Sequence, residues 1–492
     1  MINLPVSRRE IIWIGIASLV ILAACLTPGM IAGNSGFPLD DAWIHQTYAR
    51  NLANNQQWSY FSGNNTNGST APLWTFLLAL GYFLKIPYLV WAYFWGGFFL
   101  FGTGVAGLVL LRELFPRHDR LTLISAILLV GEWHLGWASV SGMETILLAF
   151  GIIVLFWLSL GKQKNWLGIG TLIGLMVWIR PDAITLLGPV GLILCLEGET
   201  TKEKIIHGLT LGGGILLLFI PYMAFNKTFS GSWMPNTFYA KQAEYAELLN
   251  LNWFVRLGVT VFQPLIGGGS LLLPGVVFII WKMTAKRFWK GLAWAIWWSG
   301  YTCIYATLLP VAYQHGRYLM PAMPVFWVLG LWGTIELITR YWRKKNWAIA
   351  VKAWGFSILA IWLGFLVMGV RAYSEDVSII QSEMVTTSQW ISTHTTPDAV
   401  IAAHDIGALG YFGQRKLIDL AGLVTPEIIP IIRNEKELGK YLDQHGADYL
   451  MTFPDWYVDL PKGKGQVFQT SGGSDSQINA NHMTLYLWRD KK

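Results

Sequence analysis

Two adjacent carboxylates open a short polar segment near the N-terminus. Asp40 and Asp41 belong to PLDDAWIHQTYARNLANN, residues 38–55, which follows the first long apolar run of a chain in which only 13% of residues are charged. Apolar residues follow the pair at helical spacing, so we expect a helix with Asp40 near its N-cap and both side chains facing water. A helix N-cap would explain one of the two aspartates and would stabilise the helix by about 1 kcal/mol. The second indicates a reactive or cationic partner, because a carboxylate can take a proton from a hydroxyl group or help to bind a divalent cation.

Further polar side chains stand at the ends of apolar runs, in the motifs SGMET, WIRPDA, SWMPNTFYAKQ and AYQHGRYLMP. We expect the second and third motifs to form turns on the same side of the molecule as the acidic pair. Charged residues near membrane depth are costly and are usually paired or functional, although snorkelling or a local salt bridge explains each one equally well. The residues are Glu144, Arg180, Asp182, Asn236, Tyr239, Lys241, His315, Arg317 and Tyr318.

The elements that position these residues are built for a membrane. The hydrophobic fraction is 53%, the mean hydropathy is +0.42 and the 492 residues include 27 Trp. Apolar windows of roughly spanning length recur about eleven times, which predicts a polytopic α-helical membrane protein. The first window is too long for a signal peptide and is interpreted as a retained anchor. The windows lie near residues 11–32, 88–111, 120–138, 144–160, 165–178, 183–196, 207–226, 258–281, 288–309, 319–339 and 347–370.

Basic residues predict how the chain is oriented, because Lys and Arg in short loops stay preferentially in the cytoplasm. The basic connections alternate with others that carry few charges. They are SRRE, LRELFPRHDR, GKQKN, TKEK, WKMTAKRFWK and RYWRKKNW. This pattern places the N-terminus inside and the C-terminus outside, provided that residues 71–87 form an interfacial or re-entrant helix on the outer face rather than a span. The net charge of +7 comes largely from these loops, so it gives no reason to expect a nucleic-acid partner.

The chain divides into a membrane part and a polar C-terminal part. We expect residues 1–370 to form the transmembrane domain, with a long first outer loop at 34–87, and residues 371–492 to form a small soluble α/β domain outside the membrane. In that segment TPDAVIAAHDIGALGYFGQRKLIDLAGL suggests a strand, a Gly-rich turn and a strand, and KELGKYLDQHGADYLMTF suggests a helix, a turn and a strand. His404 and Asp405 have no paired nucleophile, which favours a structural or acceptor-binding role.

The motifs, taken in order, resemble a family. DDAWIHQTYARNLA, an Asn/Gly-rich turn and GSTAPLWTFLLALGYFL, followed by SGMET, RPDA, PNTFYAK and HGRYLMP, are similar to membrane glycosyltransferases of the GT-C superfamily. The nearest resemblance is to the mycobacterial terminal arabinofuranosyltransferase family and its bacterial relatives, and it covers most of residues 35–325. It implies a GT-C-like fold and an enzyme of the bacterial inner membrane. Such an enzyme moves a sugar from a polyprenyl-phosphate donor to an acceptor hydroxyl of a glycan, lipid or protein on the extracytoplasmic face.

The resemblance also implies roles for the candidate residues. The general base is Asp40 or Asp41, and the motif does not decide between them. Basic side chains would stabilise the charge that grows on the lipid phosphate as it leaves, and a single displacement would invert the anomeric centre. The candidates for phosphate binding are Arg317, Arg180, Lys241 and His315. Those for the acceptor or the sugar are His45, Glu144, Asp182, Asn236, Tyr239 and Tyr318. A divalent cation is compatible with the acidic pair, but the sequence assigns it no third ligand.

Two other classes of protein share the apolar composition. A lipid or glycan transporter would also be polytopic, but transporters often show repeated halves and polar groups near the middle of the bilayer. This sequence has no internal repeat, and the charged residues that we single out as site candidates lie at the predicted outer ends of the spans. A non-catalytic scaffold for a lipid-linked glycan is the third alternative, in which the two aspartates are purely structural.

Overall fold

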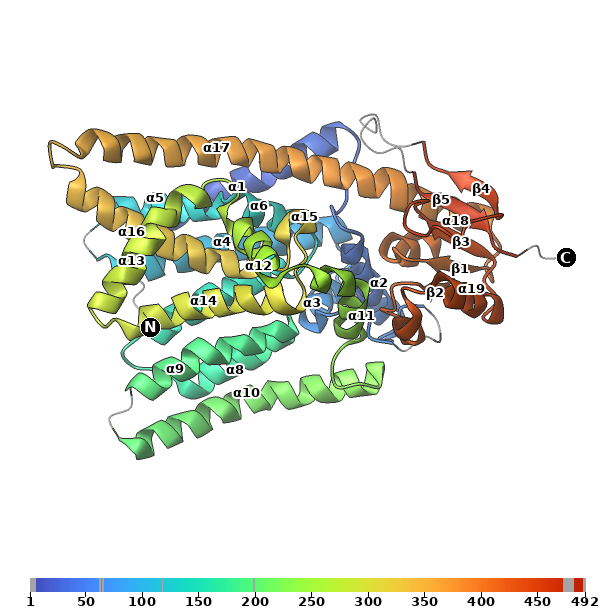
Figure 1. The fold of residues 1–492 in the computed structure, drawn as a ribbon, viewed down its shortest axis with the longest axis horizontal. Helices are drawn as coiled ribbons and strands as arrows, with labels where there is room; N and C mark the ends of the chain where they lie inside the picture. The colour runs from blue at the N-terminus through green and yellow to red at the C-terminus, as the bar shows by residue number, and fades with distance from the viewer. Residues whose placement is uncertain are drawn as a thin grey trace.

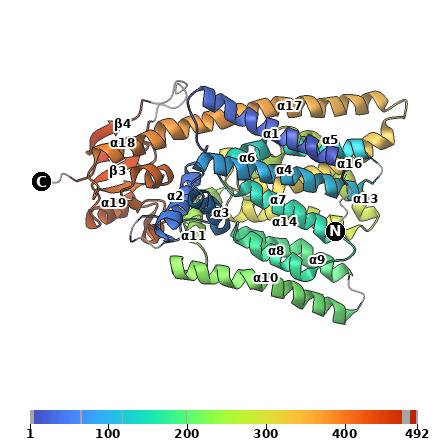
Figure 2. The ribbon, with the colours of Figure 1, turned by 180° about the vertical axis from the view of Figure 1, so that it is seen from behind.

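The computed structural model describes residues 6–61, 63, 66–116, 118–197, 200–471 and 482–489. A bundle of helices fills most of the molecule, and a small sheet covers one end of it (Figure 1). The helices of the bundle run roughly along the long axis of the molecule, and the view from behind shows the same arrangement (Figure 2).

Helices form in each of the apolar windows found in the sequence. They are α1 (Arg8–Ile31), α4 (Tyr88–Leu114), α5 (Asp119–Val130), α6 (Trp133–Val140), α7 (Thr145–Leu160), α8 (Trp166–Val177), α9 (Leu187–Glu197), α10 (Thr201–Ser230), α12 (Trp253–Phe262), α13 (Gly269–Ala285), α14 (Trp289–Leu308), α16 (Met323–Tyr341) and α17 (Ala348–Ile379). Within the described residues, five stretches are long and apolar enough to cross a membrane alone, or up to seven if two bent pairs count as one span each. The prediction of a polytopic helical membrane protein is confirmed, whereas the eleven spans and the orientation stay predictions.

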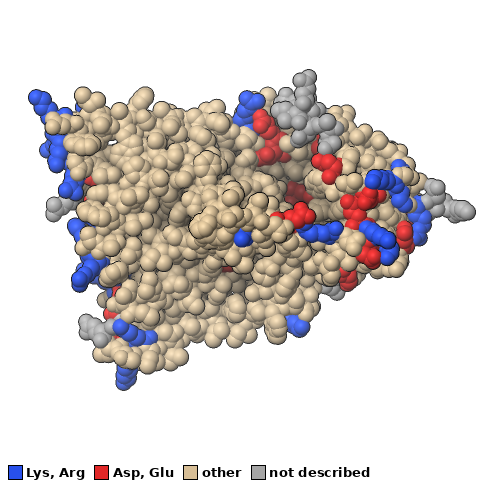
Figure 3. Space-filling model, in the orientation of Figure 1, with Lys and Arg blue, Asp and Glu red and all other residues tan. Residues whose placement is uncertain are grey.

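The surface of the bundle matches a membrane environment. Large apolar side chains on its outer helices point away from the protein, for example Leu209 of α10 and Phe356 of α17, which are 72% and 73% exposed. Figure 3 shows a broad band almost free of charge, with Lys and Arg gathered at the end of the bundle that lies away from the sheet. Apolar side chains in such a band would contact lipid.

Short helices fill the space between the bundle and the sheet (Figure 1). They are α2 (Asp40–Asn55), α3 (Pro72–Phe83), α11 (Asn236–Glu244) and α15 (Tyr313–Gly316). Helix α3 falls within the segment expected to be interfacial and packs on α2. Helix α11 replaces the turn expected for PNTFYAK, so that expectation was wrong. Its Pro235 cap has the extended backbone from which a helix can start.

The C-terminal part is an α/β unit, as the sequence predicts. Helix α17 continues through a π-helical turn, η5 (Ile380–Val385), into α18 (Thr386–His394). The sheet has the order β2-β1-β3-β5-β4. The first three strands pair in parallel, and β5 pairs antiparallel with both β3 and β4. The strands are β1 (Val400–Ala403), β2 (Lys416–Asp419), β3 (Tyr449–Thr452), β4 (Gly465–Gln469) and β5 (Thr484–Leu487), and α19 (Glu435–Gln444) precedes β3.

The connection between β1 and β2 is longer than the simple Gly-rich turn expected from the sequence. It contains a π-helical segment, η6 (Leu409–Gly413). Because β1 and β2 run parallel, the chain must return to the starting edge before β2, and a hairpin turn cannot do that. This return loop brings residues 406–408 onto the first turn of α2. The domain boundary near residue 370 stays a prediction, since one helix runs through it.

Candidate functional site

The first of the two aspartates is covered by the C-terminal part. Asp40 is the first residue of α2 and is only 9% exposed. Its carboxylate accepts hydrogen bonds from the backbone N–H groups of Gly407, at 2.5 Å, and Ala408, at 2.8 Å. The expectation that both acids face water was therefore wrong for Asp40, because the loop after β1 caps it. Both oxygens of this carboxylate are engaged in joining α2 to the sheet.

Gly407 is required by this close contact. A Cβ atom at this position would lie 1.9 Å from the backbone oxygen of Asp40, which cannot move without displacing α2. We expect Gly407→Ala to lower the free energy of unfolding by about 1–3 kcal/mol, the usual cost of overpacking. Thermal unfolding in lipid nanodiscs measures the change. Gly439→Ala in α19 is the control, because its Cβ would meet only ordinary contacts at 3.6 Å or more. Equal stability of the two variants would contradict the prediction.

The side chain of the second aspartate, Asp41, faces basic side chains, whereas that of Asp40 binds backbone N–H groups. Arg317 donates from Nη2 to Asp41 Oδ2 at 2.5 Å, and the Asp41 side chain is 27% exposed. Burial acts to raise the pKa of Asp41, but Arg317 and Lys241 outweigh it and hold the pKa below its usual value. Asp40 behaves in the opposite way, because burial and the nearby Asp405 carboxylate raise its pKa. Environments that push two pKa values apart are typical of acid and base pairs with different tasks.

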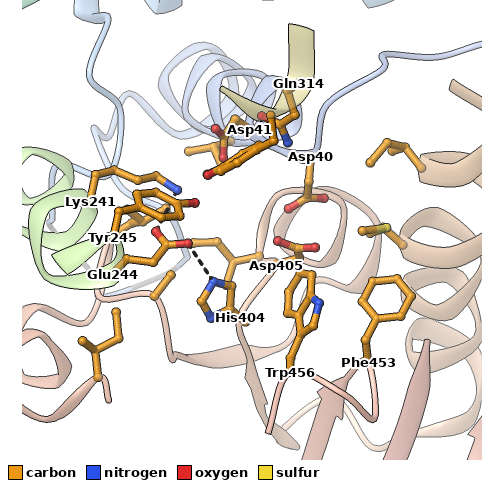
Figure 4. A pocket seen from close by; sticks show the side chains of 18 of the residues that line it. Asp40, Asp41, Lys241, Glu244, Tyr245, Gln314, His404, Asp405, Phe453 and Trp456 are labelled. Atoms are coloured by element: carbon orange, nitrogen blue, oxygen red, sulfur yellow. Dashed lines mark hydrogen bonds and ion pairs between the residues drawn. The ribbon is translucent and has the colours of Figure 1, made fainter. Parts of the chain in front are cut away.

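Two cavities meet at Asp41. We call the larger one, of about 770 Å³, the acidic cavity; it lies between α2, α11 and the C-terminal part (Figure 4). Its carboxylates are Asp40, Asp41, Glu244, Glu247, Asp376, Asp405, Glu435 and Asp455. The smaller one, of about 330 Å³, is the apolar cavity, which lies among the start of α7, η1 (Pro181–Leu186) and the end of α14. Asp41, Ile44, Lys241, Arg317 and Leu423 line both.

Arg317 has N–H groups for which the described residues provide no acceptor. Its side chain is buried, and besides Asp41 it donates from Nη2 to the Tyr318 hydroxyl at 3.2 Å. Its Nη1 and Nε atoms are buried and have no hydrogen-bond partner among the described residues. Leaving buried guanidinium N–H groups without acceptors is costly, and an oxygen of an anion such as a phosphate would be a suitable acceptor for either of them. Arg317 itself lines both cavities, beside Asp41.

Lys241 connects this junction to the C-terminal part. It donates to Glu244 Oε2 at 3.1 Å, and Glu244 Oε1 lies 3.3 Å from Nε2 of His404 (Figure 4). Burial acts to raise the pKa of Glu244, but Lys241 and His404 outweigh it and lower the pKa to about 2. The other ring nitrogen of His404 lies 2.9 Å from the Tyr457 hydroxyl. A chain of polar contacts thus fixes α11 against the loops that follow β1 and β3.

Several predicted residues line the apolar cavity. Arg180 and Asp182 form a two-pronged ion pair at 3.1 and 3.2 Å, and Tyr305 donates to Asp182 at 2.6 Å. His45 Nε2 lies 3.6 Å from Glu144 Oε2, and both residues line the same cavity. Arg180 contacts its carboxylate partner through both Nε and Nη2, whereas Arg317 contacts Asp41 through Nη2 alone. Tyr318 also lines this cavity.

Three predicted residues line neither cavity. His315 is held 2.8 Å from Asp376 and stands edge-on to two Trp rings. Asn236 is buried and donates to the backbone oxygen of Leu423 at 3.4 Å. Tyr239 is 40% exposed and contacts Phe238. The structure therefore does not bring these three side chains to the junction at Asp41.

Other residues of the acidic cavity were not singled out as site residues in the sequence. Glu244 is three positions after Lys241, so the α11 helix places both on one face. His404 and Asp405 directly follow β1, a position where parallel sheets often bind ligands, and this signal was available. Trp456 lies in a loop after β3 with no recognisable sequence pattern.

Among the described residues, no three His, Cys, Asp or Glu side chains converge as metal ligands. The two aspartates of α2 point to different partners.

Comparisons with known proteins bear on the fold. Residues 374–486 match a domain of unknown function, DUF8728. No curated protein matches the sequence. The structure is similar to ArnT from Cupriavidus metallidurans bound to undecaprenyl phosphate, with 14% identity, a TM-score of 0.62 and 99% of each chain covered.

Two further structures are similar to this chain. The Archaeoglobus fulgidus oligosaccharyltransferase has 12% identity and a TM-score of 0.59, over 96% of this chain and 75% of that one. The arabinofuranosyltransferase AftD from mycobacteria has 15% identity and a TM-score of 0.52, over 99% of this chain and 40% of that one. All of these proteins are GT-C superfamily members. The resemblance predicted from the motifs is thus confirmed in three dimensions, and the chain has the GT-C fold.

Proposed function

We propose that the protein is a GT-C-type glycosyltransferase that moves a sugar from a polyprenyl-phosphate donor to an acceptor hydroxyl of the cell envelope. The observation that carries this proposal is the junction of two cavities, where an ionised Asp41 stands beside Arg317, two of whose N–H groups have no partner among the described residues. A general base and an anion site side by side suit the transfer of a sugar away from a phosphate. Similar structures hold undecaprenyl phosphate or dolichol-phosphate.

The base in this proposal is Asp41 rather than Asp40. Asp40 gives both oxygens to the backbone N–H groups of Gly407 and Ala408, so they are already engaged in holding the loop after β1. Asp41 is ionised and opens onto both cavities. It takes the proton of the acceptor hydroxyl as that oxygen attacks the anomeric carbon. The bond from the anomeric carbon to the phosphate oxygen breaks with its electron pair going to the phosphate, so one displacement inverts the anomeric centre.

Arg317 and Lys241 receive the leaving phosphate. Negative charge on the phosphate grows in the transition state, and fixed donors aimed at it lower the barrier. As Arg317 engages the phosphate, its hold on Asp41 weakens and the carboxylate becomes a better base. Arg180 and Asp182, with His45 and Glu144, are assigned to the hydroxyls of the donor sugar in the apolar cavity.

The membrane placement belongs to the same proposal. Residues 1–370 form the transmembrane domain, and residues 371–492 form a soluble domain on the extracytoplasmic side of the bacterial inner membrane. The basic end of the bundle, which lies away from the sheet, supports this orientation (Figure 3). The polyprenyl chain would lie against the apolar side chains of the bundle.

A transfer assay tests the proposal. The full-length protein in lipid nanodiscs is given a panel of radiolabelled polyprenyl-phosphate sugars together with an envelope extract as the source of acceptor. We expect label to leave at least one donor and free polyprenyl phosphate to accumulate, as thin-layer chromatography would show. Heat-inactivated protein is the control. The same protein is reconstituted into sealed vesicles in parallel. Movement of intact donor across these vesicles without its cleavage would instead establish a transporter, and binding without either outcome would establish a scaffold.

A further inference from the structure

The three parallel strands of the C-terminal sheet all end at the acidic cavity. Strand β1 leads into His404 and Asp405, and β3 leads into Phe453 and Trp456. Strand β2 is followed by Ala421, which also lines the cavity. Ligands of open parallel sheets bind outside the carboxyl ends of the strands. This edge of the sheet therefore forms one wall of the cavity that contains Asp41.

An aromatic side chain on this wall is held in place but left partly open. Trp456 is 43% exposed and packs at 5.1 Å against both the Phe453 ring and the His404 ring. His404 is itself fixed between Tyr457 and Glu244. Figure 4 shows Trp456 beside the Asp405 carboxylate, which in turn lies next to that of Asp40. A rigid indole face of this kind packs against the C–H face of a sugar ring, while nearby carboxylates accept hydrogen bonds from its hydroxyls.

The charge of the cavity restricts the ligand. Eight carboxylates line it, against three Lys or Arg side chains, which are Lys241, Arg317 and Arg433. No described residue donates a hydrogen bond to Asp405, and burial, together with the nearby Asp41 carboxylate, raises its pKa to about 6 although His404 acts against this rise. An anionic ligand would meet this excess of carboxylates over basic side chains, whereas an uncharged ligand with many hydroxyls would supply donors to Asp405.

We propose that the C-terminal sheet recognises the acceptor, and that the acceptor is an uncharged saccharide whose ring stacks on Trp456 and whose hydroxyls bind Asp405. This inference rests on the proposed function, since it assigns the acceptor of the same site. The cavity volume of about 770 Å³ falls within the range of roughly 300–1,000 Å³ that ligand sites occupy. The stacked ring would lie on the side of Asp405 away from α2, and the next sugar of the chain would reach Asp41.

Direct binding tests this proposal without turnover. The full-length protein in nanodiscs is titrated with maltotetraose, mannotetraose and chitotetraose, with trigalacturonate as an anionic saccharide and with a Ser/Thr-rich peptide. Calorimetry and saturation-transfer NMR report the affinity. Undecaprenyl phosphate binding is measured in the same samples as a separate readout of the donor site. The variants are Trp456→Ala, Trp456→Phe and, as a size-matched control outside both cavities, Trp233→Ala, which replaces a 58% exposed ring.

We expect at least one uncharged oligosaccharide to bind, and Trp456→Ala to raise its Kd at least about tenfold, as loss of an aromatic anchor does. Trp456→Phe should retain most of the affinity, and Trp233→Ala should bind as the wild type does. Undecaprenyl phosphate affinity should be the same in all of them. No saccharide binding by the wild type, equal binding by Trp456→Ala, or binding of trigalacturonate or the peptide alone would overturn the inference. Failure of undecaprenyl phosphate to bind would instead count against the proposed function.

Discussion

Replacing Asp41 with Asn is expected to lower kcat for sugar transfer by about 10²- to 10⁴-fold, which is what a positioned general base contributes. The amide keeps the size of the carboxylate and can still accept a hydrogen bond from Arg317, so the junction of the cavities should persist. It cannot take the proton of the acceptor hydroxyl. Initial rates at saturating donor measure the loss, and undecaprenyl phosphate affinity in the same preparation should not fall.

Asp40→Asn is the matched control, because it makes the same chemical change one residue away. Its amide has one acceptor oxygen for the two N–H groups of Gly407 and Ala408, so one of these bonds is lost. We expect a lower unfolding temperature and a much smaller loss of kcat than in Asp41→Asn. The assignment of the base fails if the two variants lose equal activity, or if Asp40→Asn loses more while it stays folded.

Arg317→Gln is expected to lower kcat by about 10²- to 10³-fold, the cost of removing one donor aimed at the charge of a transition state. The affinity for undecaprenyl phosphate should fall as well, because the buried N–H groups that await an anion are lost. Arg317→Lys should recover only part of the activity, since an ammonium lacks the planar fork of the guanidinium.

Arg371→Gln serves as the control for Arg317→Gln. Arg371 lies on α17, its side chain is 82% exposed and it pairs with Glu375. We expect its removal to leave both turnover and lipid phosphate affinity as they are in the wild type. Wild-type turnover by Arg317→Gln in a folded preparation would remove Arg317 from the mechanism.

The membrane helices could be located from the sequence because apolar runs of that length have few other uses. The positions at which these helices bend could not be located from the sequence. The window at residues 258–281 falls on α12 and α13, which meet at an angle of 103°. Pro264 and the glycines at 267–269 occur at this break, but the same residue types also occur inside α13 and other straight helices. Only packing against neighbouring helices decides which of them breaks a span.

The acidic pair shows why the site was only partly predictable. Two identical side chains in one helical turn receive opposite surroundings from residues that are far away in the chain. Arg317 lies 276 positions after Asp41, and Gly407 lies 367 positions after Asp40. Local pattern carries no information about such partners, so the sequence could name the pair but not distinguish its members. Tyr239 and Lys241 were likewise equivalent until the helix α11 directed only Lys241 to the cavities.

The unbroken helix from α17 to α18 sets a distance as well as a connection. Ala348–His394 forms 47 consecutive helical residues, a length of about 70 Å at 1.5 Å per residue, more than twice the roughly 30 Å of a hydrocarbon core. A continuous helix of this length fixes the distance between the acidic cavity and the bilayer. If the proposed function holds, an acceptor anchored in the same membrane would have to project far enough from the bilayer to reach this cavity.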